Sequence, residues 1–288
     1  MSARSTKRVG IVGSGIMGSG IAETAAVHGF EVVLRSRSQS TADGMLAGME
    51  KSLAKQVEKE KLSESDRDAA LGRVTAVSDL GELAGCDLVI ESVVEDMTVK
   101  KHLFNELDRI CEDGTILATN TSTLPVVELA METGRPEQVC GIHFFNPAPV
   151  MALVEVVRPI TASDDTIAAA TAFAEACGKS PVEVKDQAGF IVNALLFPYL
   201  NNAVRLLEQG VASREDIDTA MKGGCGFPMG PFALLDLVGL DTSLAILDAL
   251  YGEFRDPNYA AVPLLRRMVT AELLGRKSGK GFYDYHKK

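Results

Sequence analysis

Short apolar runs alternate with helical stretches along the first two thirds of the chain. The apolar runs are rich in β-branched residues, whereas the stretches between them repeat apolar side chains at helical spacing. Such alternation predicts a mainly parallel sheet with helices on both of its faces. We predict strands over residues 8–12, 31–35, 73–77, 86–91, 114–120, 138–145, 153–157 and 180–184.

One stretch interrupts this alternation. Residues 41–71 are charged and have helical periodicity, and within them Ser63 precedes Asp66 by the three-residue spacing of a helix cap. We interpret this stretch as a two-helix excursion between two strands of the sheet.

The pattern changes after about residue 187, beyond which no further strand is predicted. Residues 189–210 form one long apolar stretch, which predicts a helix with a kink near Pro198. Glycine and proline clusters then separate further helices. We therefore expect an α/β domain over residues 1–186 and an all-helical domain over residues 187–288.

The predicted helices of the second domain are apolar around much of their circumference. A domain of roughly 100 residues does not bury that much apolar surface alone. We therefore expect a homodimer that forms through the C-terminal helical domain.

Composition excludes several classes of protein. The chain has a net charge of -10 and no basic tract, so nucleic acid is not an expected partner. No apolar run reaches the ~18 residues of a membrane span, and the N-terminus has no apolar segment of a secretory signal. Five scattered cysteines predict free thiols in a reducing cytoplasm, and the spacing of Cys and His predicts no metal site.

The segment GSGIMG follows the first predicted strand and opens a helix. Its glycines have the spacing Gly13-x-Gly15-x-x-Gly18, with Ile16 and Met17 between the last two. In dinucleotide-binding units these glycines allow a tight turn, close approach of a pyrophosphate and close packing of helix on strand. The helix N-terminus then offers unpaired N–H groups to the phosphates. The motif predicts a Rossmann-type first domain.

A second candidate site lies in GIHFFNPAPVMALVEV. His143 stands at the end of a predicted strand, and Glu155 lies on the next strand among Leu and Val. A carboxylate in apolar surroundings needs a partner, and His143 is one candidate. Such a pair holds the imidazole in one tautomer, which suits a general base. From spacing alone, a structural histidine and a solvent-facing glutamate remain the alternative.

The chain resembles the L-3-hydroxyacyl-CoA dehydrogenase family, and within it the short members that act on 3-hydroxybutyryl-CoA. The resemblance extends over nearly the whole length and includes GSGIMGSGIA, VIESVVEDMTVKKHLFNELD, ATNTSTL, GIHFFNPAPVMALVEVV, DQAGFIVNALLFPYLNNA, GFPMGPFALLDLVGLD and GRKSGKGFYDY. It implies reversible, nicotinamide-dependent oxidation of a 3-hydroxyacyl-CoA. One departure is Ala194, where the family usually has arginine.

The resemblance also implies roles for individual residues. His143 and Glu155 match the family's catalytic pair, with Ser122 and Asn193 at the substrate hydroxyl and Asn146 as a supporting residue. Cofactor contacts are implied for Glu95, Lys100 and Lys277, and coenzyme A contacts for Ser52 and Lys59.

Several of these residues also have an interpretation that involves no ligand. Glu95 and Lys100 fit a solvated helix start, Ser122 a turn hydroxyl, and Lys59 a charged, solvated face. For the whole chain, the alternatives are a dehydrogenase acting on a hydroxy acid without coenzyme A, and a non-catalytic nucleotide sensor on the same scaffold.

The residues at the end of the second predicted strand indicate whether the chain binds NAD(H) or NADP(H). NAD sites usually carry a carboxylate there that binds the ribose hydroxyls, but this chain has Ser36 between Arg35 and Arg37. Serine removes the repulsion of a 2′-phosphate, and arginine matches phosphate with its planar fork. We therefore expect NADP(H) to be favoured over NAD(H).

Overall fold

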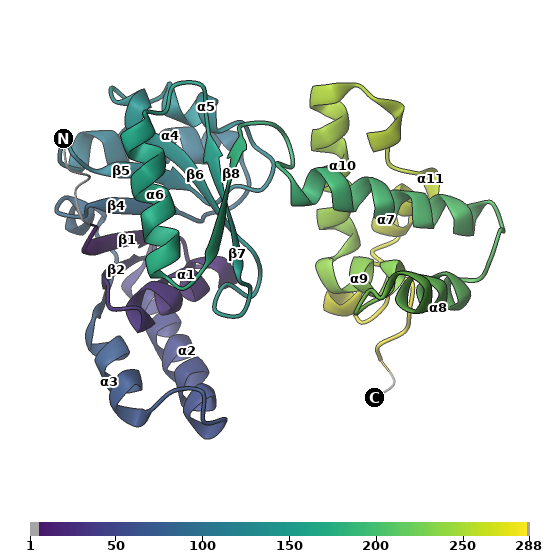
Figure 1. The fold of residues 1–288 in the computed structure, drawn as a ribbon, viewed down its shortest axis with the longest axis horizontal. Coiled ribbons are helices and arrows are strands. Elements are labelled where there is room, and N and C mark those ends of the chain that lie inside the picture. Colours follow the sequence, from purple (N-terminus) through teal and green to yellow (C-terminus); the bar gives the residue numbers. More distant parts are fainter. Residues whose placement is uncertain (1–5, 287–288) are drawn as a thin grey trace. The chain divides into compact units, whose positions relative to one another are not determined.

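The computed structural model describes residues 6–286 and contains two compact units, Met1–Gln187 and Ala188–Lys288 (Figure 1). In the described residues the first unit combines a sheet with helices, and the second consists of helices joined by turns. The predicted fold class is confirmed. None of the helices in residues 6–286 combines the length and the apolarity that a membrane span requires.

Eight strands form a single sheet in the order β3-β2-β1-β4-β5-β6-β7-β8. Every predicted apolar run coincides with one of them to within a few residues at its ends. Their bounds are β1 (Arg8–Val12), β2 (Glu31–Arg35), β3 (Val74–Val77), β4 (Leu88–Glu91), β5 (Ile116–Thr119), β6 (Val139–Phe144), β7 (Leu153–Arg158) and β8 (Ser180–Lys185).

The direction of the strands fixes where a ligand site lies. β1 to β6 are mutually parallel, so their carboxyl ends meet at one edge of the sheet. β7 pairs antiparallel with β6, and β8 then runs parallel to β7. The chain order reverses at β1, which lies between β2 and β4. In open α/β sheets the crevice at such a reversal, outside the carboxyl ends, is where ligands bind.

Six α-helices accompany the sheet. They are α1 (Ile16–Val27), α2 (Gln39–Glu58), α3 (Glu64–Gly72), α4 (Met97–Ile110), α5 (Val126–Ala130) and α6 (Asp164–Ala176). Side chains of α1, α2, α3 and α6 share one apolar core with the strands, in which Phe30 and Phe173 meet edge to face. α4 and α5 contact each other and bury Leu103, Phe104 and Leu129.

The charged stretch after β2 folds as α2 and α3. Ser38 and Ser63 cap the two helices, because their side chains accept hydrogen bonds from the backbone N–H groups of Thr41 and Asp66. α2 buries Met45, Met49 and Leu53, which are spaced by one helical turn and belong to the core of the α/β unit. One face of α2 therefore anchors the pair of helices, while its other faces are charged.

The described part of the second unit, residues 188–286, contains five α-helices and two short 3₁₀ turns. They are α7 (Val192–Glu208), α8 (Arg214–Cys225), α9 (Pro231–Val238), α10 (Leu240–Phe254), η3 (Pro257–Tyr259), α11 (Pro263–Thr270) and η4 (Arg276–Ser278). α7 continues as one helix through Pro198.

Two buried carboxylates fasten the C-terminal segment to the helices. Asp236 on α9 accepts hydrogen bonds from the backbone N–H groups of Phe282 and Tyr283 at 2.9 and 2.8 Å. Asp218 on α8 accepts one from the hydroxyl of Tyr283 at 3.0 Å and one from the N–H of Phe232, in the first turn of α9, at 2.8 Å. Burial raises the pKa of Asp236, against the effect of its hydrogen bonds. The segment is thus part of the packed unit.

Candidate active site

The turn between β1 and α1 needs two of its three motif glycines for its own geometry. Gly13 has φ +140°, and a Cβ there would lie 2.2 Å from the carbonyl oxygen of Ser92. A Cβ on Gly18 would lie 2.5 Å from the carbonyl oxygen of Gly13. Gly15 differs, because a Cβ built there meets nothing within 4 Å. The open space beside Gly15 allows a ligand to approach the backbone closely at this third position.

The N-terminus of α1 points out of the same turn. The helix begins at Ile16, and its N-cap residue Gly15 provides no side-chain hydrogen bond to the first turn. The first backbone N–H groups of this helix therefore form an anion site of the kind that binds a pyrophosphate. Ile16 is 78% exposed beside these groups, and Met17 is half-buried.

At the end of β2, Ser36 is buried but its hydroxyl has no hydrogen-bond partner among residues 6–286. Arg35 is the last residue of β2, and its Nε donates to the carbonyl oxygen of Ser78 at 3.2 Å. Arg37 lies beyond the strand and is exposed. The two arginines therefore differ in their surroundings. An unpartnered buried hydroxyl at this position fits a ligand group that completes its hydrogen bonding.

His143 and Glu155 lie directly opposite each other in the antiparallel ladder of β6 and β7. Opposed residues place their side chains on the same face of the sheet. His143 Nδ1 is 2.7 Å from Glu155 Oε2, and both side chains are buried. A carboxylate that accepts from Nδ1–H leaves the lone pair of the imidazole on Nε2.

The loop after β6 is fixed from the neighbouring strand. Asn120, just after β5, accepts a hydrogen bond from the backbone N–H of Phe144 at 2.8 Å. Phe145 lies against the imidazole of His143, with ring centroids 4.5 Å apart. Asn146 follows and is exposed.

Glu95 and Ser122 meet near the carboxyl ends of β4 and β5. Glu95 Oε1 accepts hydrogen bonds from the hydroxyl of Thr121 at 2.5 Å and from the backbone N–H of Ser122 at 2.9 Å. Burial by itself raises the pKa of Glu95, but the charge of Lys100 and these hydrogen bonds outweigh it, so the pKa is lowered. Glu95 therefore remains ionised and orders the loop that carries Ser122.

Lys100 is not part of a solvated helix start. It is 1% exposed, and its ammonium lies 2.7 Å from Glu91 Oε1 and 3.2 Å from Glu95 Oε2. The helix start is instead marked by Asp96, whose side chain accepts from the N–H of Val99.

The residues matched to coenzyme A contacts lie along α2. The hydroxyl of Ser52 donates to Glu23 Oε1 at 3.1 Å, and Gln56 donates to the same oxygen at 2.7 Å. Burial raises the pKa of Glu23 despite these two bonds. Lys59 is the C-cap residue of α2 and is exposed.

The two remaining predicted residues belong to the helical unit. Asn193 is buried in the first turn of α7. Lys277 is exposed, and its ammonium lies 2.5 Å from Asp241 Oδ2, which helps to lower the pKa of that carboxyl. Within residues 6–286, no three His, Cys, Asp or Glu side chains are grouped as metal ligands.

Sequence reasoning missed Glu91, whose carboxylate is fully buried at the end of β4. A carboxylate in an apolar strand needs a partner, and this argument applies to Glu91 in CDLVIE as it does to Glu155 in LVEVV. A second signal was the periodicity of α4. Lys100 shares a stripe with Leu103, Phe104 and Leu107, all buried, so it occupies a core position of the helix.

Two family models match the chain along almost its entire length. The 3-hydroxyacyl-CoA dehydrogenase NAD-binding domain matches residues 8–187, and the C-terminal domain of the same family matches residues 189–285. The chain belongs to the 3-hydroxyacyl-CoA dehydrogenase family.

Individual relatives support this assignment. A 3-hydroxybutyryl-CoA dehydrogenase of Clostridioides difficile is 47% identical over 280 residues, which cover 97% of this chain and 100% of that protein. The human mitochondrial hydroxyacyl-coenzyme A dehydrogenase is 43% identical, with 97% and 91% covered. The crystal structure of (S)-3-hydroxybutyryl-CoA dehydrogenase from Ralstonia eutropha has a TM-score of 0.96 at 44% identity, covering 98% of this chain and 100% of that one.

The two kinds of motif glycine predict different outcomes on substitution. Gly15 has φ −85° and ψ 176°, which alanine adopts freely, so Gly15→Ala should leave thermal stability unchanged. Its methyl group should weaken binding of nicotinamide dinucleotide by about tenfold or more, because it occupies the approach to the pyrophosphate. Gly18→Ala should instead destabilise the protein by about 1–3 kcal/mol, because its Cβ overlaps backbone. Calorimetric titration and thermal melts of both variants check this, and equal losses of stability would contradict it.

Proposed function

We propose that this protein catalyses the reversible oxidation of 3-hydroxybutyryl-CoA to acetoacetyl-CoA with a nicotinamide dinucleotide. The buried pair of His143 and Glu155 carries the proposal, because it provides an oriented base at the carboxyl edge of the sheet. Relatives named 3-hydroxybutyryl-CoA dehydrogenase, matched over their whole length, support the choice of substrate.

In the oxidation, Nε2 of His143 takes the proton of the C3 hydroxyl. A nicotinamide dinucleotide bound at the turn after β1 would supply the acceptor for the hydride of C3. Glu155 holds the Nδ1–H in place and stabilises the positive charge that the imidazole gains. In the direction of reduction, the protonated His143 returns the proton to the C3 oxygen.

Other residues orient the reactants. Ser122, ordered through the contact of its backbone N–H with Glu95, is proposed to contact the C3 oxygen, and the family resemblance adds Asn193 and Asn146. Glu95, Lys100 and Lys277 are proposed on the cofactor side. Ser52 and Lys59 are proposed for coenzyme A, where the ammonium of Lys59 suits a phosphate. Because the hydroxyl of Ser52 donates to Glu23, it offers its lone pairs to a donor group of the ligand.

For the cofactor, the proposal favours NADP(H) over NAD(H). Ser36 supports it, since this buried hydroxyl without a partner stands where an NAD site has a repelling carboxylate. Arg37, exposed directly beyond it, is the proposed phosphate ligand, and Arg35 adds positive charge while held by Ser78.

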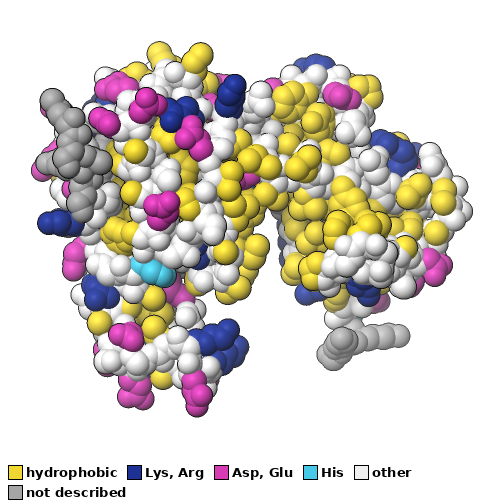
Figure 2. Space-filling view, viewed as in Figure 1, with side chains coloured by type: hydrophobic (Ala, Val, Ile, Leu, Met, Phe, Trp, Pro, Cys, Tyr) yellow, Lys and Arg dark blue, Asp and Glu magenta, His cyan; other side chains and the backbone are white. Residues whose placement is uncertain are grey.

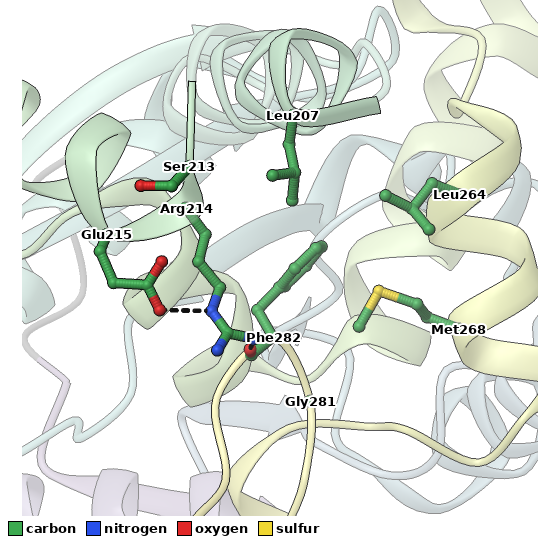
Figure 3. A pocket seen from close by; sticks show the side chains of 8 residues that line it. All are labelled: Leu207, Ser213, Arg214, Glu215, Leu264, Met268, Gly281 and Phe282. Atoms are coloured by element: carbon green, nitrogen blue, oxygen red, sulfur yellow. Dashed lines mark hydrogen bonds and ion pairs between the residues drawn. The ribbon is translucent and has the colours of Figure 1, made fainter. Parts of the chain in front are cut away.

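The proposed assembly is a homodimer through the helical unit. Figure 2 shows apolar side chains gathered on the surface of this unit. Leu195, Val211 and Leu237 are 72%, 65% and 48% exposed. A cavity of about 410 Å³ between α7, α8, α11 and the C-terminal segment is lined largely by apolar side chains, among them Leu207 and Phe282 (Figure 3). Exposed apolar side chains gathered on one surface support an interface there.

His143→Gln should lower kcat for acetoacetyl-CoA reduction by ~10²–10⁴-fold and leave cofactor affinity unchanged, because the imidazole acts on the substrate proton. Glu155→Gln should keep the fold and lower kcat, because the charge that stabilises the imidazolium is lost. Steady-state kinetics with acetoacetyl-CoA, and with free acetoacetate as the competing substrate, measure both effects.

The exposed His102, changed to Gln, and Glu183 on β8, changed to Gln, are matched controls that should retain wild-type kcat. Retention of more than about a tenth of kcat in His143→Gln would exclude it as the general base. A preference for free acetoacetate would exclude the coenzyme A substrate.

The cofactor proposal predicts that Ser36→Asp combined with Arg37→Leu shifts kcat/KM from NADPH toward NADH. The new carboxylate binds ribose hydroxyls and repels the 2′-phosphate, while the substitution of Arg37 removes its proposed ligand. Parallel assays with NADH and NADPH measure the ratio. A wild-type preference for NADH of about tenfold or more, equivalent to 1.4 kcal/mol, would overturn the preference for NADP(H).

Analytical ultracentrifugation should show a dimer at micromolar concentration. Leu195→Glu should shift the protein toward the monomer if this exposed side chain of α7 lies in the interface, because a charge buried there lacks a partner. Sedimentation of the unmodified protein as a compact monomer would contradict the proposed assembly.

A further inference from the structure

The β6–β7 loop, residues 145–152, joins the strands that carry His143 and Glu155. It begins with Phe145, whose ring lies against the imidazole of His143, and continues with Asn146. A shift of this loop moves the ring that packs on the imidazole. The side chains that fix the loop from outside therefore bear on the orientation of the proposed base.

Lys179 binds this loop from the turn between α6 and β8. Its ammonium donates to the carbonyl oxygens of Ala148 and Met151, at 2.7 and 3.0 Å. The next residue, Ser180, adds a backbone hydrogen bond from its N–H to the carbonyl oxygen of Ala152 at 2.7 Å. Within the described part of the chain, both hydrogen bonds of the Lys179 side chain go to the loop. The turn between α6 and β8 thus fastens the second half of the loop.

The partners of this ammonium are neutral carbonyl groups. Burial lowers the pKa of Lys179, because half-burying a cation without an opposite charge disfavours its charged form. The chain therefore keeps a cation at some cost in a place where it holds two carbonyl oxygens of one loop.

Helix α1 gives the loop a second support, at Gly20. A Cβ built on Gly20 would lie 3.2 Å from Cβ of Ala148 and 3.2 Å from Cδ of Pro149. Gly20 lies beyond the first turn of α1, whose N–H groups form the proposed pyrophosphate site. A side chain at this position of the helix would press on the loop.

We propose that Lys179 and Gly20 are positioning residues for the proposed reaction. Lys179 holds the β6–β7 loop, and the missing side chain of Gly20 lets the loop lie close against α1. The proposal rests on the function proposed above, in which His143 is the base and Asn146 supports it. Both positioning residues act through the loop and its Phe145, and a misplacement of about 1 Å can cost about 10²-fold in rate.

Substitutions of Lys179 test the first support. Lys179→Met removes both hydrogen bonds and keeps the length of the side chain, so kcat for acetoacetyl-CoA reduction should fall about tenfold or more. Dissociation constants of NADH and NADPH, measured by nucleotide fluorescence, should stay within about threefold of wild type, because the loop is not the nucleotide site. Lys179→Arg keeps a cation with several donors and should recover most of the loss in kcat. Lys185→Met removes an exposed lysine of β8 and should retain wild-type kcat.

Gly20→Ala separates positioning from a loss of stability. Alanine favours a helix by about 1 kcal/mol over glycine, so the thermal midpoint should stay near or above that of wild type. The new methyl group presses on the loop, so kcat should fall about tenfold. The matched control is Gly44→Ala on α2, where a Cβ meets nothing within 4 Å. It should raise the thermal midpoint and retain kcat.

Hydrogen exchange tests the loop without any substrate. The backbone N–H groups of Val150 and Met151 both donate to the carbonyl oxygen of Pro147, at 2.9 and 3.0 Å. This turn should open more often once Lys179 no longer holds it, so Lys179→Met should speed exchange in the loop about tenfold. Lys185→Met should leave exchange in the loop unchanged.

Three results would overturn the proposal. The first is unchanged kcat in Lys179→Met and Gly20→Ala. The second is a rise in the nucleotide dissociation constant that matches the loss of kcat, which would place the effect at the nucleotide site. The third is unchanged exchange of the loop in Lys179→Met. If the unmodified protein does not reduce acetoacetyl-CoA, the proposed function fails, and hydrogen exchange still decides whether Lys179 holds the loop.

Discussion

The antiparallel register of β6 and β7 is the constraint on which the catalytic arrangement depends. It sets His143 opposite Glu155, and a slip of one residue would turn Glu155 to the other face of the sheet. The ladder is held at its other end by Gly141, where a Cβ would lie 2.6 Å from Cβ of Val157. A hydrogen bond to a charged group contributes about 1.5–3 kcal/mol, so the geometry of the pair and the stability of the sheet are linked.

Two carboxylates of this unit differ in the direction of their pKa shifts, according to their partners. Glu95 faces an ammonium, and its pKa is lowered, whereas Glu23 receives only neutral donors, and its pKa is raised by burial. The lowered pKa means that Glu95 contributes stability above its unfolded pKa, and this contribution is lost as the pH falls through the folded value. The raised pKa of Glu23 has the opposite effect on stability. Its contribution is present at low pH, where the carboxyl is protonated, and is lost as the pH rises through the folded pKa. The two groups therefore respond to acid in opposite directions.

The sequence predicted the strands well because each is a short β-branched run between turn signals, and the mainly parallel sheet followed from the alternation with helices. The order of the strands in the sheet was not predicted. It also predicted that Glu155 needs a partner, although only the register shows that the partner is His143. The network of Glu91 and Lys100 was not predicted. The two residues are nine positions apart on a strand and a helix, and the charged neighbours of Lys100 suggested solvent. Pairing of buried charges depends on packing between elements, which local patterns do not specify.

The fastening of the C-terminal segment by Asp218 and Asp236 has a consequence for synthesis on the ribosome. The sheet of the first unit is complete once Lys185 has been translated, so that unit has all its strands while the helices are still being made. The helical unit, in contrast, obtains the donors for Asp236 only when Phe282 to Tyr285 have emerged. Until then Asp236 lacks these donors, whereas Asp218 already accepts from the backbone N–H groups of Phe232 and Ala233. We therefore expect the nucleotide-binding unit to fold first during synthesis and the helical unit last.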